Sequence, residues 1–373
     1  MKIAIITNPL HTNYGGILQA YAMQTVLERM GYKATIINRP QQKPIPYFKL
    51  PFYIAKRLIL KYVLHKPTVR IFEEFYRRKI HPIICQHTQR FIHNYIHNRI
   101  LHSPSQIKEG EYDALVVGSD QIWRPRYYKP IEITYLSFAK KWKNIKRIAY
   151  APSFGVDTWE YTPKQTLRCK KLIKLFDLVT VREDSGTKLC AEYYDVNAVH
   201  VLDPTMLLQK EDYIKLVEVA HQPKSKGDMM AYILDLSTSI ENDLLIVAAQ
   251  KKMKLFYTSS KVDNPNAPLN ERIQQPIEQW LRGFMDANFI VTDSFHACVF
   301  SIIFNKDFAV IGNKSRGLSR FLSLLKMYGL EKRLIENTQE ASSLPPINWE
   351  KVNNIWNEKK LESQTLLQSA LSK

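Results

Sequence analysis

The sequence predicts an α/β protein in which two Rossmann-like domains face each other across a cleft. Three observations support this fold class. Short apolar runs of strand length recur along the chain, stretches of helical periodicity alternate with them, and polar turns follow the runs. A length of 373 residues suits two domains better than one core, and 45% apolar residues are enough to fill both.

The first half opens with a β–loop–α–β unit. Residues 3–7 form a continuous apolar run, as a buried parallel strand should. Gly15 and Gly16 then precede a helical pattern over residues 17–30, and the next strand is expected at 34–37. This is the unit of a doubly wound sheet. Further strands are predicted at 114–117, 148–151, 178–181 and 199–202, with a helix over 163–176.

A second series of the same kind begins near residue 228. The segment 221–227 has the composition of a linker. Strands are predicted at 230–234, 255–258, 289–292 and 308–311, with helices over 279–286 and 296–304. We therefore expect an N-terminal domain over 1–215, a C-terminal domain over 216–345, and a final helix over 346–373 that could pack back on the first domain.

Residues 41–110 interrupt this rhythm and predict a basic helical insertion in the first domain. They contain 13 Lys and Arg against 3 Asp and Glu, in a chain of formal net charge +18. Such charge fits nucleic acid, an anionic membrane surface or a phosphorylated substrate. Residues 47–65 mix aromatic, aliphatic and basic side chains, which is typical of a helix at a membrane interface; the alternative is an amphipathic helix packed on its own domain.

The cysteines indicate reduced thiols and a cytoplasmic protein, with a peripheral position on the inner face of the membrane as an option. The four cysteines show neither metal-ligand spacing nor a disulfide framework. The first residues predict a strand and not a signal peptide, and no apolar run is long enough to span a bilayer. We expect no metal site and no cofactor.

Two polar turns of the first half are candidate binding sites. Asn13-Tyr14-Gly15-Gly16 opens a helix directly after the first strand, where backbone N–H groups favour an anion. It matches neither G-x-G-x-x-G nor a P-loop, so a plain tight turn is the alternative. His11 stands in the same loop.

The second turn holds Ser119, Asp120 and Trp123. Asp120 could act as a base or bind sugar hydroxyls, and Trp123 could stack on a sugar ring. The alternative is a capping Ser or Asp with a tryptophan in the core. Arg182, at the end of a later strand, could hold a carboxylate or phosphate bidentately; the alternative is an ion pair with Glu183 or another nearby acid.

The second half contributes Asp293-Ser294-Phe295-His296, at the end of a buried strand. His296 is the best general acid/base candidate because imidazole titrates near neutral pH, and a structural histidine is the alternative. The loop after the next strand suits a phosphate or is simply a solvated basic loop. Its three cations are Lys314, Arg316 and Arg320.

These motifs, taken in order, resemble the polysaccharide pyruvyl transferase family over about residues 1–325. The segments that carry the resemblance are NYGGILQAY, DALVVGSDQIW, IAYAPSFG, VREDSGTKL, VLDPT, TDSFHACVFSIIF and SRGLSRF.

The resemblance implies a GT-B-like fold, phosphoenolpyruvate as donor, and no further cofactor. The acceptor would be a sugar of a cell-surface polysaccharide or its lipid-linked oligosaccharide precursor, and the product a pyruvate ketal. His296 and Arg182 take the catalytic and donor roles. Some members have Arg-Leu-His where this chain has Ser294-Phe295-His296. The other donor-side residues would be Ser294, Phe295, Lys314, Arg316 and Arg320, and the acceptor side would hold Asn13, Tyr14, Gly15, Gly16, Ser119, Asp120 and Trp123.

Two other functions remain open from the sequence. A glycosyltransferase with a nucleotide-sugar donor would share the fold and need an acid for the ribose, for which Glu278 is a weak candidate. A non-catalytic basic protein would bind membrane or nucleic acid. Because the charge sits in the insertion while the polar motifs sit at strand ends, we expect no nucleic-acid partner.

Overall fold

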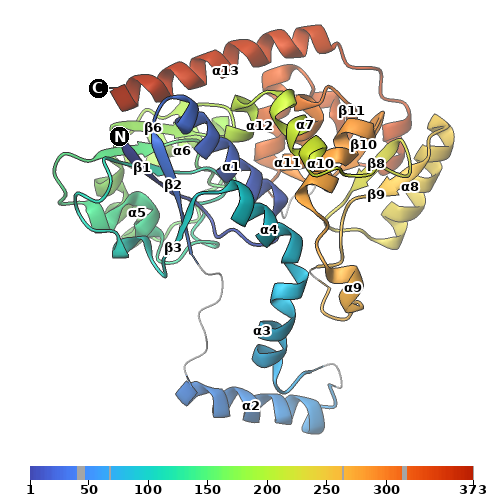
Figure 1. Cartoon of the computed structure of the whole chain (residues 1–373), viewed down its shortest axis with the longest axis horizontal. Coiled ribbons are helices and arrows are strands. Elements are labelled where there is room, and N and C mark those ends of the chain that lie inside the picture. The colour runs from blue at the N-terminus through green and yellow to red at the C-terminus, as the bar shows by residue number, and fades with distance from the viewer. Residues whose placement is uncertain (40–46, 67–68, 263, 313–316, 373) are drawn as a thin grey trace.

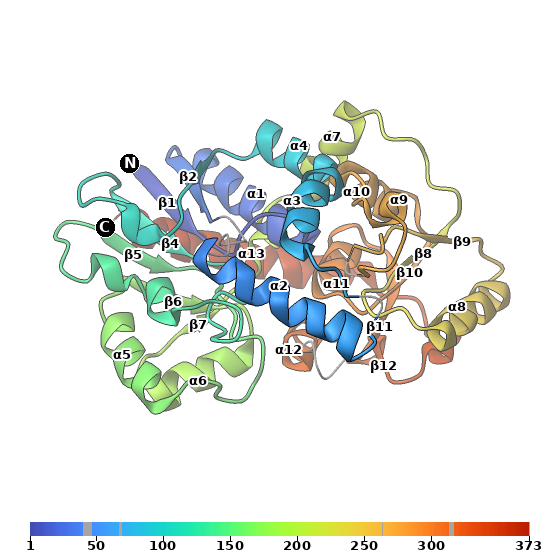
Figure 2. The same cartoon turned by 90° about the horizontal axis from the view of Figure 1, so that it is seen from below.

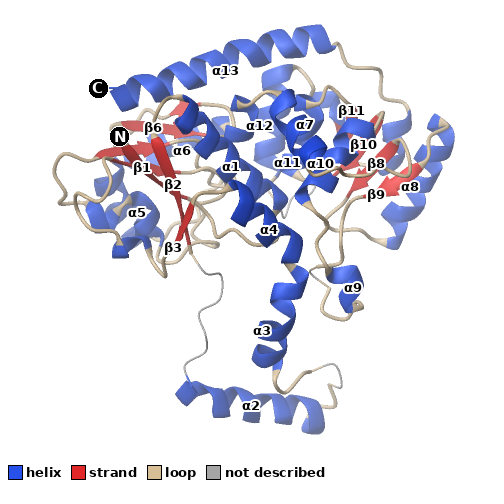
Figure 3. Cartoon of the chain, in the orientation of Figure 1, coloured by secondary structure: helices blue, strands red, loops and turns tan. Residues whose placement is uncertain are grey.

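The fold contains two parallel β-sheets, each covered by helices (Figure 1, Figure 3). It is described by a computed structural model, which covers residues 1–39, 47–66, 69–262, 264–312 and 317–372. The predicted fold class, two parallel-sheet α/β domains, is therefore confirmed.

The first sheet has seven strands in the order β3-β2-β1-β4-β5-β6-β7, and every pairing is parallel. β1 lies inside the sheet, next to the central strand β4, and its Ile3 pairs with Ala34 on one side and Ala114 on the other. Its apolar run is buried on both faces, as helices on both sides of a parallel sheet require. The strands are β1 (Lys2–Ile6), β2 (Lys33–Asn38), β3 (Asn98–Ile100), β4 (Ala114–Val117), β5 (Lys146–Ala149), β6 (Leu178–Val181) and β7 (Val199–His200).

The second sheet has five strands in the order β12-β11-β10-β8-β9, again all parallel. β10 is buried along its whole length. The strands are β8 (Met229–Tyr232), β9 (Leu255–Tyr257), β10 (Phe289–Thr292), β11 (Asp307–Ile311) and β12 (Leu334–Ile335).

Each sheet has one point where its strand order reverses, between β1 and β4 in the first and between β8 and β10 in the second. Loops leaving such neighbouring strands diverge to opposite faces and open a crevice at the carboxyl ends of the strands. The predicted polar turns follow β1, β4 and β10, so they lie at these two crevices.

One hydrophobic core joins the two domains. Its apolar side chains come from helices of both, including Ile17 of the first and Trp280 and Phe300 of the second. The ring of Tyr14 lies 5.4 Å from that of Trp280 across the domain boundary. The main covering helices are α1 (Tyr14–Arg29), α5 (Pro163–Ile173), α6 (Asp184–Tyr194), α7 (Lys210–Val219), α8 (Thr238–Lys251), α9 (Leu269–Arg272), α10 (Ile277–Asp286), α11 (Phe295–Ile303) and α12 (Leu318–Tyr328).

The segment between β2 and β3 forms an arm. α4 (Gln86–Tyr95) packs on the body, and α3 (Glu73–Ile84) leads away from it to α2 (Leu50–Leu58) at the far end (Figure 1, Figure 2). A 3₁₀ turn, Tyr47–Lys49, precedes α2, and a π-helical turn, Ile59–Val63, follows it. Arg57 ties α2 to α3 through an ion pair with Glu74. No helix in the described part of the chain is long and apolar enough to cross a bilayer.

The last helix, α13 (Trp349–Ser372), runs along both domains on the side opposite the arm (Figure 1). Trp356 Nε1 donates to the carbonyl of Met206 at 2.8 Å, and Lys146 Nζ donates to the carbonyl of Leu371 at 2.7 Å. The helix also packs on α12. α13 therefore connects the two domains through side chains of its buried face.

We expect Leu367→Ala to lower the free energy of unfolding by about 2–5 kcal/mol, because it leaves a cavity at a fully buried position of α13. Guanidinium denaturation measures the change. Leu361→Ala is the matched control on the same helix, since that side chain is 67% exposed and should change stability by less than about 0.5 kcal/mol. Equal effects of the two substitutions would contradict the placement of α13.

Candidate functional site

A pocket of about 440 Å³ lies between the two domains, at the crevices of both sheets. Its wall comes from the loops after β1, β2 and β4 in the first domain, and from the loops after β8 and β10 and helix α12 in the second. We call it the reaction pocket. It is lined by Asn8, Pro9, His11, Asn13, Gly16, Arg39, Asp120, Gln121, Tyr127, Leu234, Asp293, Ser294, Phe295, His296 and Arg320.

The Gly-Gly turn brings the first turn of α1 against His296. The helix starts at Tyr14, three residues before the predicted start, because Asn13 caps it: its Oδ1 accepts from Gly16 N at 3.2 Å. Gly15 faces the imidazole so closely that an added Cβ would overlap the His296 ring. Glycine is therefore required at position 15 for the domains to meet.

His296 faces a buried carboxylate of the other domain. It stands in the first turn of α11, and its Nε2 lies 3.7 Å from Asp203 Oδ2. Asp203 Oδ2 also accepts from Arg182 Nη1 at 2.9 Å, and its Oδ1 accepts from Thr205 N at 3.0 Å. Ser119 Oγ lies 3.3 Å from the same Oδ2. Asp203 thus connects the arginine, the serine and the histidine.

The buried carboxylates of Asp203 and Asp120 are held ionised. Burial alone would raise the pKa of Asp203, but its interactions with His296 and Arg182 outweigh burial and hold that pKa far below its usual range. Burial likewise opposes the charge of Asp120, and the charges of Arg182 and then His296 overcome it, so its pKa is also lowered. Asp120 Oδ2 accepts from Asn8 Nδ2 at 3.2 Å. Two fixed negative charges therefore stand beside the imidazole.

Two arginines approach the ring of Phe295. The guanidinium of Arg182 lies 4.6 Å from the ring centroid and that of Arg320 lies 5.3 Å away. Burial, followed by the charge of Arg182, lowers the pKa of Arg320 to about 10, which leaves it charged at neutral pH. Arg320 lines the reaction pocket, whereas Arg182 lies behind it, 3.6 Å from Asp120 Oδ1.

The loop that carries His296 is held by Asp293, whose Oδ1 and Oδ2 accept from Leu234 N at 2.7 Å and Asp235 N at 3.0 Å. These bonds join the turns after β8 and β10, the two strands at the crevice of the second sheet. Within the residues that the structure describes, no group of three or more His, Cys, Asp or Glu side chains could hold a metal ion.

Residues 13–315 match the family described as polysaccharide pyruvyl transferase. This chain belongs to the polysaccharide pyruvyl transferase family. It is accordingly an enzyme, a transferase of polysaccharide biosynthesis whose acceptor is a polysaccharide or sugar. No curated protein matches the sequence.

Three solved structures illustrate the distant likeness of the whole chain. The glycotransferase of kitacinnamycin shares 12% identity at a TM-score of 0.48, covering 99% of each chain. UDP-GlcNAc 2-epimerase from Neisseria meningitidis shares 12% identity at a TM-score of 0.46, and the match covers 98% of this chain and 100% of that one. UGT71G1 of Medicago truncatula, complexed with UDP-glucose, shares 11% identity at a TM-score of 0.48, and the match covers 100% of this chain and 98% of that one. The family assignment rests on the family match alone.

Seven of the predicted site residues line the reaction pocket of the transferase: Asn13, Gly16, Asp120, Ser294, Phe295, His296 and Arg320. Gly15 and Arg182 lie directly behind its wall, against His296 and Asp203. Lys314 and Arg316 fall outside the described residues.

Tyr14, Ser119 and Trp123 do not line the pocket, and their assignment to the acceptor side stays a prediction. Tyr14 is buried at the domain boundary, where its hydroxyl donates to the carbonyl of Gln275 at 2.8 Å. Ser119 is buried beside Asp203. Trp123 is fully buried, because its ring stacks on Tyr135 at 4.8 Å and its Nε1 donates to the carbonyl of Thr134. Its alternative interpretation, a core tryptophan, is the observed one.

Three residues at or beside the pocket were not among the predicted site residues: Asp203, Asn8 and Arg39. Asp203 stands in the segment VLDPT, directly after a predicted strand, so its position follows the same pattern as the other site residues. Asn8 and Arg39 follow β1 and β2 in the same way. Arg39 lines the pocket with its guanidinium 4.0 Å from the ring centroid of Tyr128. Its signal was a lone cation after a strand.

We expect Gly15→Ala to reduce transfer activity by at least tenfold, because the new methyl group displaces the His296 ring or separates the domains. Turnover measurements and circular dichroism together check this. Gly312→Ala is the control: it has an ordinary backbone conformation, and an added Cβ meets nothing closer than 3.5 Å. Wild-type turnover in Gly15→Ala would show that the close approach to His296 is dispensable.

Proposed function

We propose that this transferase moves the pyruvyl group of phosphoenolpyruvate onto a sugar of a cell-surface polysaccharide or its lipid-linked precursor, forming a pyruvate ketal. The observation that carries the proposal is an imidazole, His296, in a pocket that also holds the cations Arg39 and Arg320. The donor carries a carboxylate and a phosphate, and guanidinium groups bind both with two parallel hydrogen bonds.

The reaction needs one group that gives a proton and takes one back. Protonation of the donor's methylene carbon makes C2 electrophilic, and a sugar hydroxyl attacks it while its proton returns to the imidazole. The C2–O bond to phosphate then breaks, phosphate departs, and a second hydroxyl closes the ketal as its proton leaves with the phosphate. In this proposal His296 carries out the proton transfer.

Two carboxylates stand beside His296. Asp203 faces Nε2 at 3.7 Å, and Asp120 adds a second negative charge. Arg182 then has a positioning role, since it holds Asp203 and contacts Phe295 from behind the pocket. Asp120, Asn13 and Asn8, on the first-domain wall, offer hydrogen-bonding groups to acceptor hydroxyls.

A nucleotide-sugar donor is less well supported. Glu278, the acid considered for a ribose, pairs with Arg90 Nη2 at 3.1 Å and does not line the reaction pocket. The described wall of that pocket includes no glutamate, and its two carboxylates, Asp120 and Asp293, already accept hydrogen bonds from neighbouring protein groups.

We expect His296→Ala to lower phosphate release from phosphoenolpyruvate by about 10²- to 10⁴-fold while the protein stays folded, because a general acid contributes that much. A coupled phosphate assay with a panel of lipid-linked sugars measures it. His102→Ala, at an exposed histidine outside the pocket, should behave as wild type.

Near-normal turnover in His296→Ala would refute the role of this residue. Isothermal titration separates the donors: we expect phosphoenolpyruvate to bind, and binding of nucleotide sugars alone would overturn the pyruvyl donor.

We also propose that residues 47–65 contact an anionic membrane, at the inner face if the enzyme is cytoplasmic. None of the described residues Leu50–Leu58 is buried, and Phe48 and Phe52 are 79% and 72% exposed. The segment contains basic residues and no Asp or Glu. Exposed aromatic rings beside cations suit the boundary between anionic headgroups and acyl chains.

For this contact we expect the double substitution F48S/F52S to weaken co-sedimentation with phosphatidylserine vesicles by more than tenfold, because two aromatic rings no longer enter the interface. High salt should weaken the wild type as well. Leu361→Ser, at an exposed apolar residue of α13 on the opposite side, is the control. Unchanged vesicle binding in F48S/F52S would exclude this segment as the contact.

A further inference from the structure

A second pocket, of about 330 Å³, lies where the arm meets the body. One wall is α3 and the residues before it, and the other is formed by the loop after β1 together with the segment around α9 of the second domain. Its base is firmly packed, since Gln274 N donates to the carbonyl of Ile84 at 3.0 Å and Leu269 packs on Ile80 and Ile84. We call it the arm pocket.

The arm pocket is positively charged. Among the residues that the structure describes, Arg70, Arg77 and Arg272 line it, against one carboxylate, Glu73. Glu73 Oε1 accepts from Arg77 Nε at 2.6 Å, so its charge is already neutralised by one of the arginines. His11 and His81 complete the polar wall. A net positive cavity of this size suits an anionic group.

Arg70 is held in place by its neighbours, and Arg272 is buried with unused donors. Arg70 lies 3.8 Å from the ring centroid of Tyr76, with its Nη2 3.5 Å from the carbonyl of Pro265. Arg272 is only 8% exposed, and its Nε and Nη1 have no hydrogen-bond partner among the described residues. A buried guanidinium with unused donors loses free energy unless an anion or water accepts from them.

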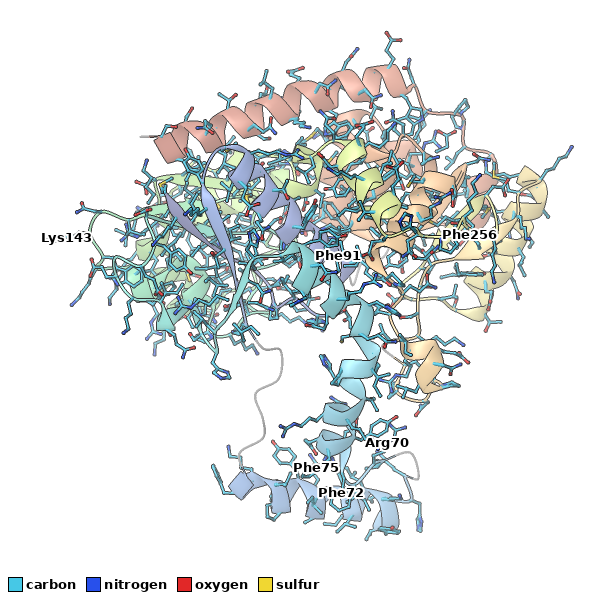
Figure 4. The ribbon with its side chains drawn as sticks, in the orientation of Figure 1. Arg70, Phe72, Phe75, Phe91, Lys143 and Phe256 are labelled. Carbon is cyan, nitrogen blue, oxygen red and sulfur yellow. The ribbon has the colours of Figure 1, made fainter. Side chains whose placement is uncertain are left out.

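The position of the arm pocket is as informative as its charge. His11 lines both this pocket and the reaction pocket, so the two adjoin. In the other direction α3 runs on to α2, and Figure 4 shows Arg70 close to Phe72 and Phe75 at that end. Both phenylalanines are exposed. The order in space is reaction pocket, basic arm pocket, exposed apolar arm.

We propose that the arm pocket binds the phosphate or diphosphate of a lipid-linked sugar acceptor. The sugar then occupies the reaction pocket, and the lipid leaves along α3 toward α2 and the membrane. This inference rests on the proposed function and identifies its acceptor class. A lipid-linked sugar consists of a polar sugar, an anionic phosphate and an apolar lipid. These three parts follow one another in the same order as the reaction pocket, the basic arm pocket and the exposed apolar arm.

Titration with inorganic pyrophosphate tests the site without any turnover. We expect Arg77→Gln to weaken pyrophosphate binding about tenfold or more, because it removes one cation and exposes the charge of Glu73. Arg78→Gln is the matched control, at an exposed arginine of the same helix that does not line the pocket. Equal binding by Arg77→Gln and wild type would overturn the proposal, as would no binding by the wild type.

Steady-state kinetics identify the source of the phosphate group. With a lipid-diphosphate sugar and with the same sugar diphosphate without lipid, Arg77→Gln should raise the acceptor KM about tenfold; with the free sugar it should change nothing. The KM for phosphoenolpyruvate should also stay the same. F48S/F52S should affect the lipid-bearing acceptor only. An equal rise in KM for the free sugar, or no rise for either diphosphate, would overturn the assignment.

Failure of the proposed pyruvyl transfer and failure of the arm-pocket proposal give different experimental results. If no acceptor supports phosphate release from phosphoenolpyruvate, the proposed reaction is refuted, and the pyrophosphate titration still decides whether the arm pocket binds a diphosphate.

Discussion

The site depends on one buried carboxylate. Asp203 stands where the first sheet ends, accepts from Arg182 and Thr205, and faces His296 of the other domain. A charge in such a place is costly unless its neighbours compensate it fully. Asp203 therefore requires the arginine behind it and the histidine in front of it, and this requirement fixes how the two domains meet.

The Gly-Gly turn serves the same constraint from the other side. Gly15 leaves room for the imidazole of His296, and Asn13 caps α1, the helix to which Gly15 belongs. The hydroxyl of Tyr14 crosses the domain boundary and donates to the carbonyl of Gln275. A motif that looks like a ligand-binding loop in the sequence is thus largely a device for docking one domain on the other. Only its two outer members, Asn13 and Gly16, face the reaction pocket.

The strands and the cleft between the domains could be predicted from the sequence, because buried parallel strands have continuous apolar runs and polar residues follow these runs. Runs such as 3–7 and 289–292 predict the strands, and the rule that ligands bind at strand ends predicts the cleft. The roles of single residues were harder to predict. A tryptophan at position 123 looks the same in the sequence whether its ring stacks on another core residue, as it does on Tyr135, or on a sugar. Asp203 acquires its role only from contacts with residues 21 and 93 positions away in the chain.

The basic insertion now has a physical explanation that its composition alone did not provide. Part of its charge lies in the arm pocket, through Arg70 and Arg77, and part lies on the exposed helix α2 and its flanking turns. A protein that needed only solubility would not place exposed aromatic rings such as Phe52 beside those cations. A protein that must bring a membrane-bound anionic substrate to a pocket needs an apolar surface that contacts the membrane and, between that surface and the pocket, a basic site for the anionic group. In the proposed arrangement, the segment that suggested a membrane contact would also bring the acceptor toward His296.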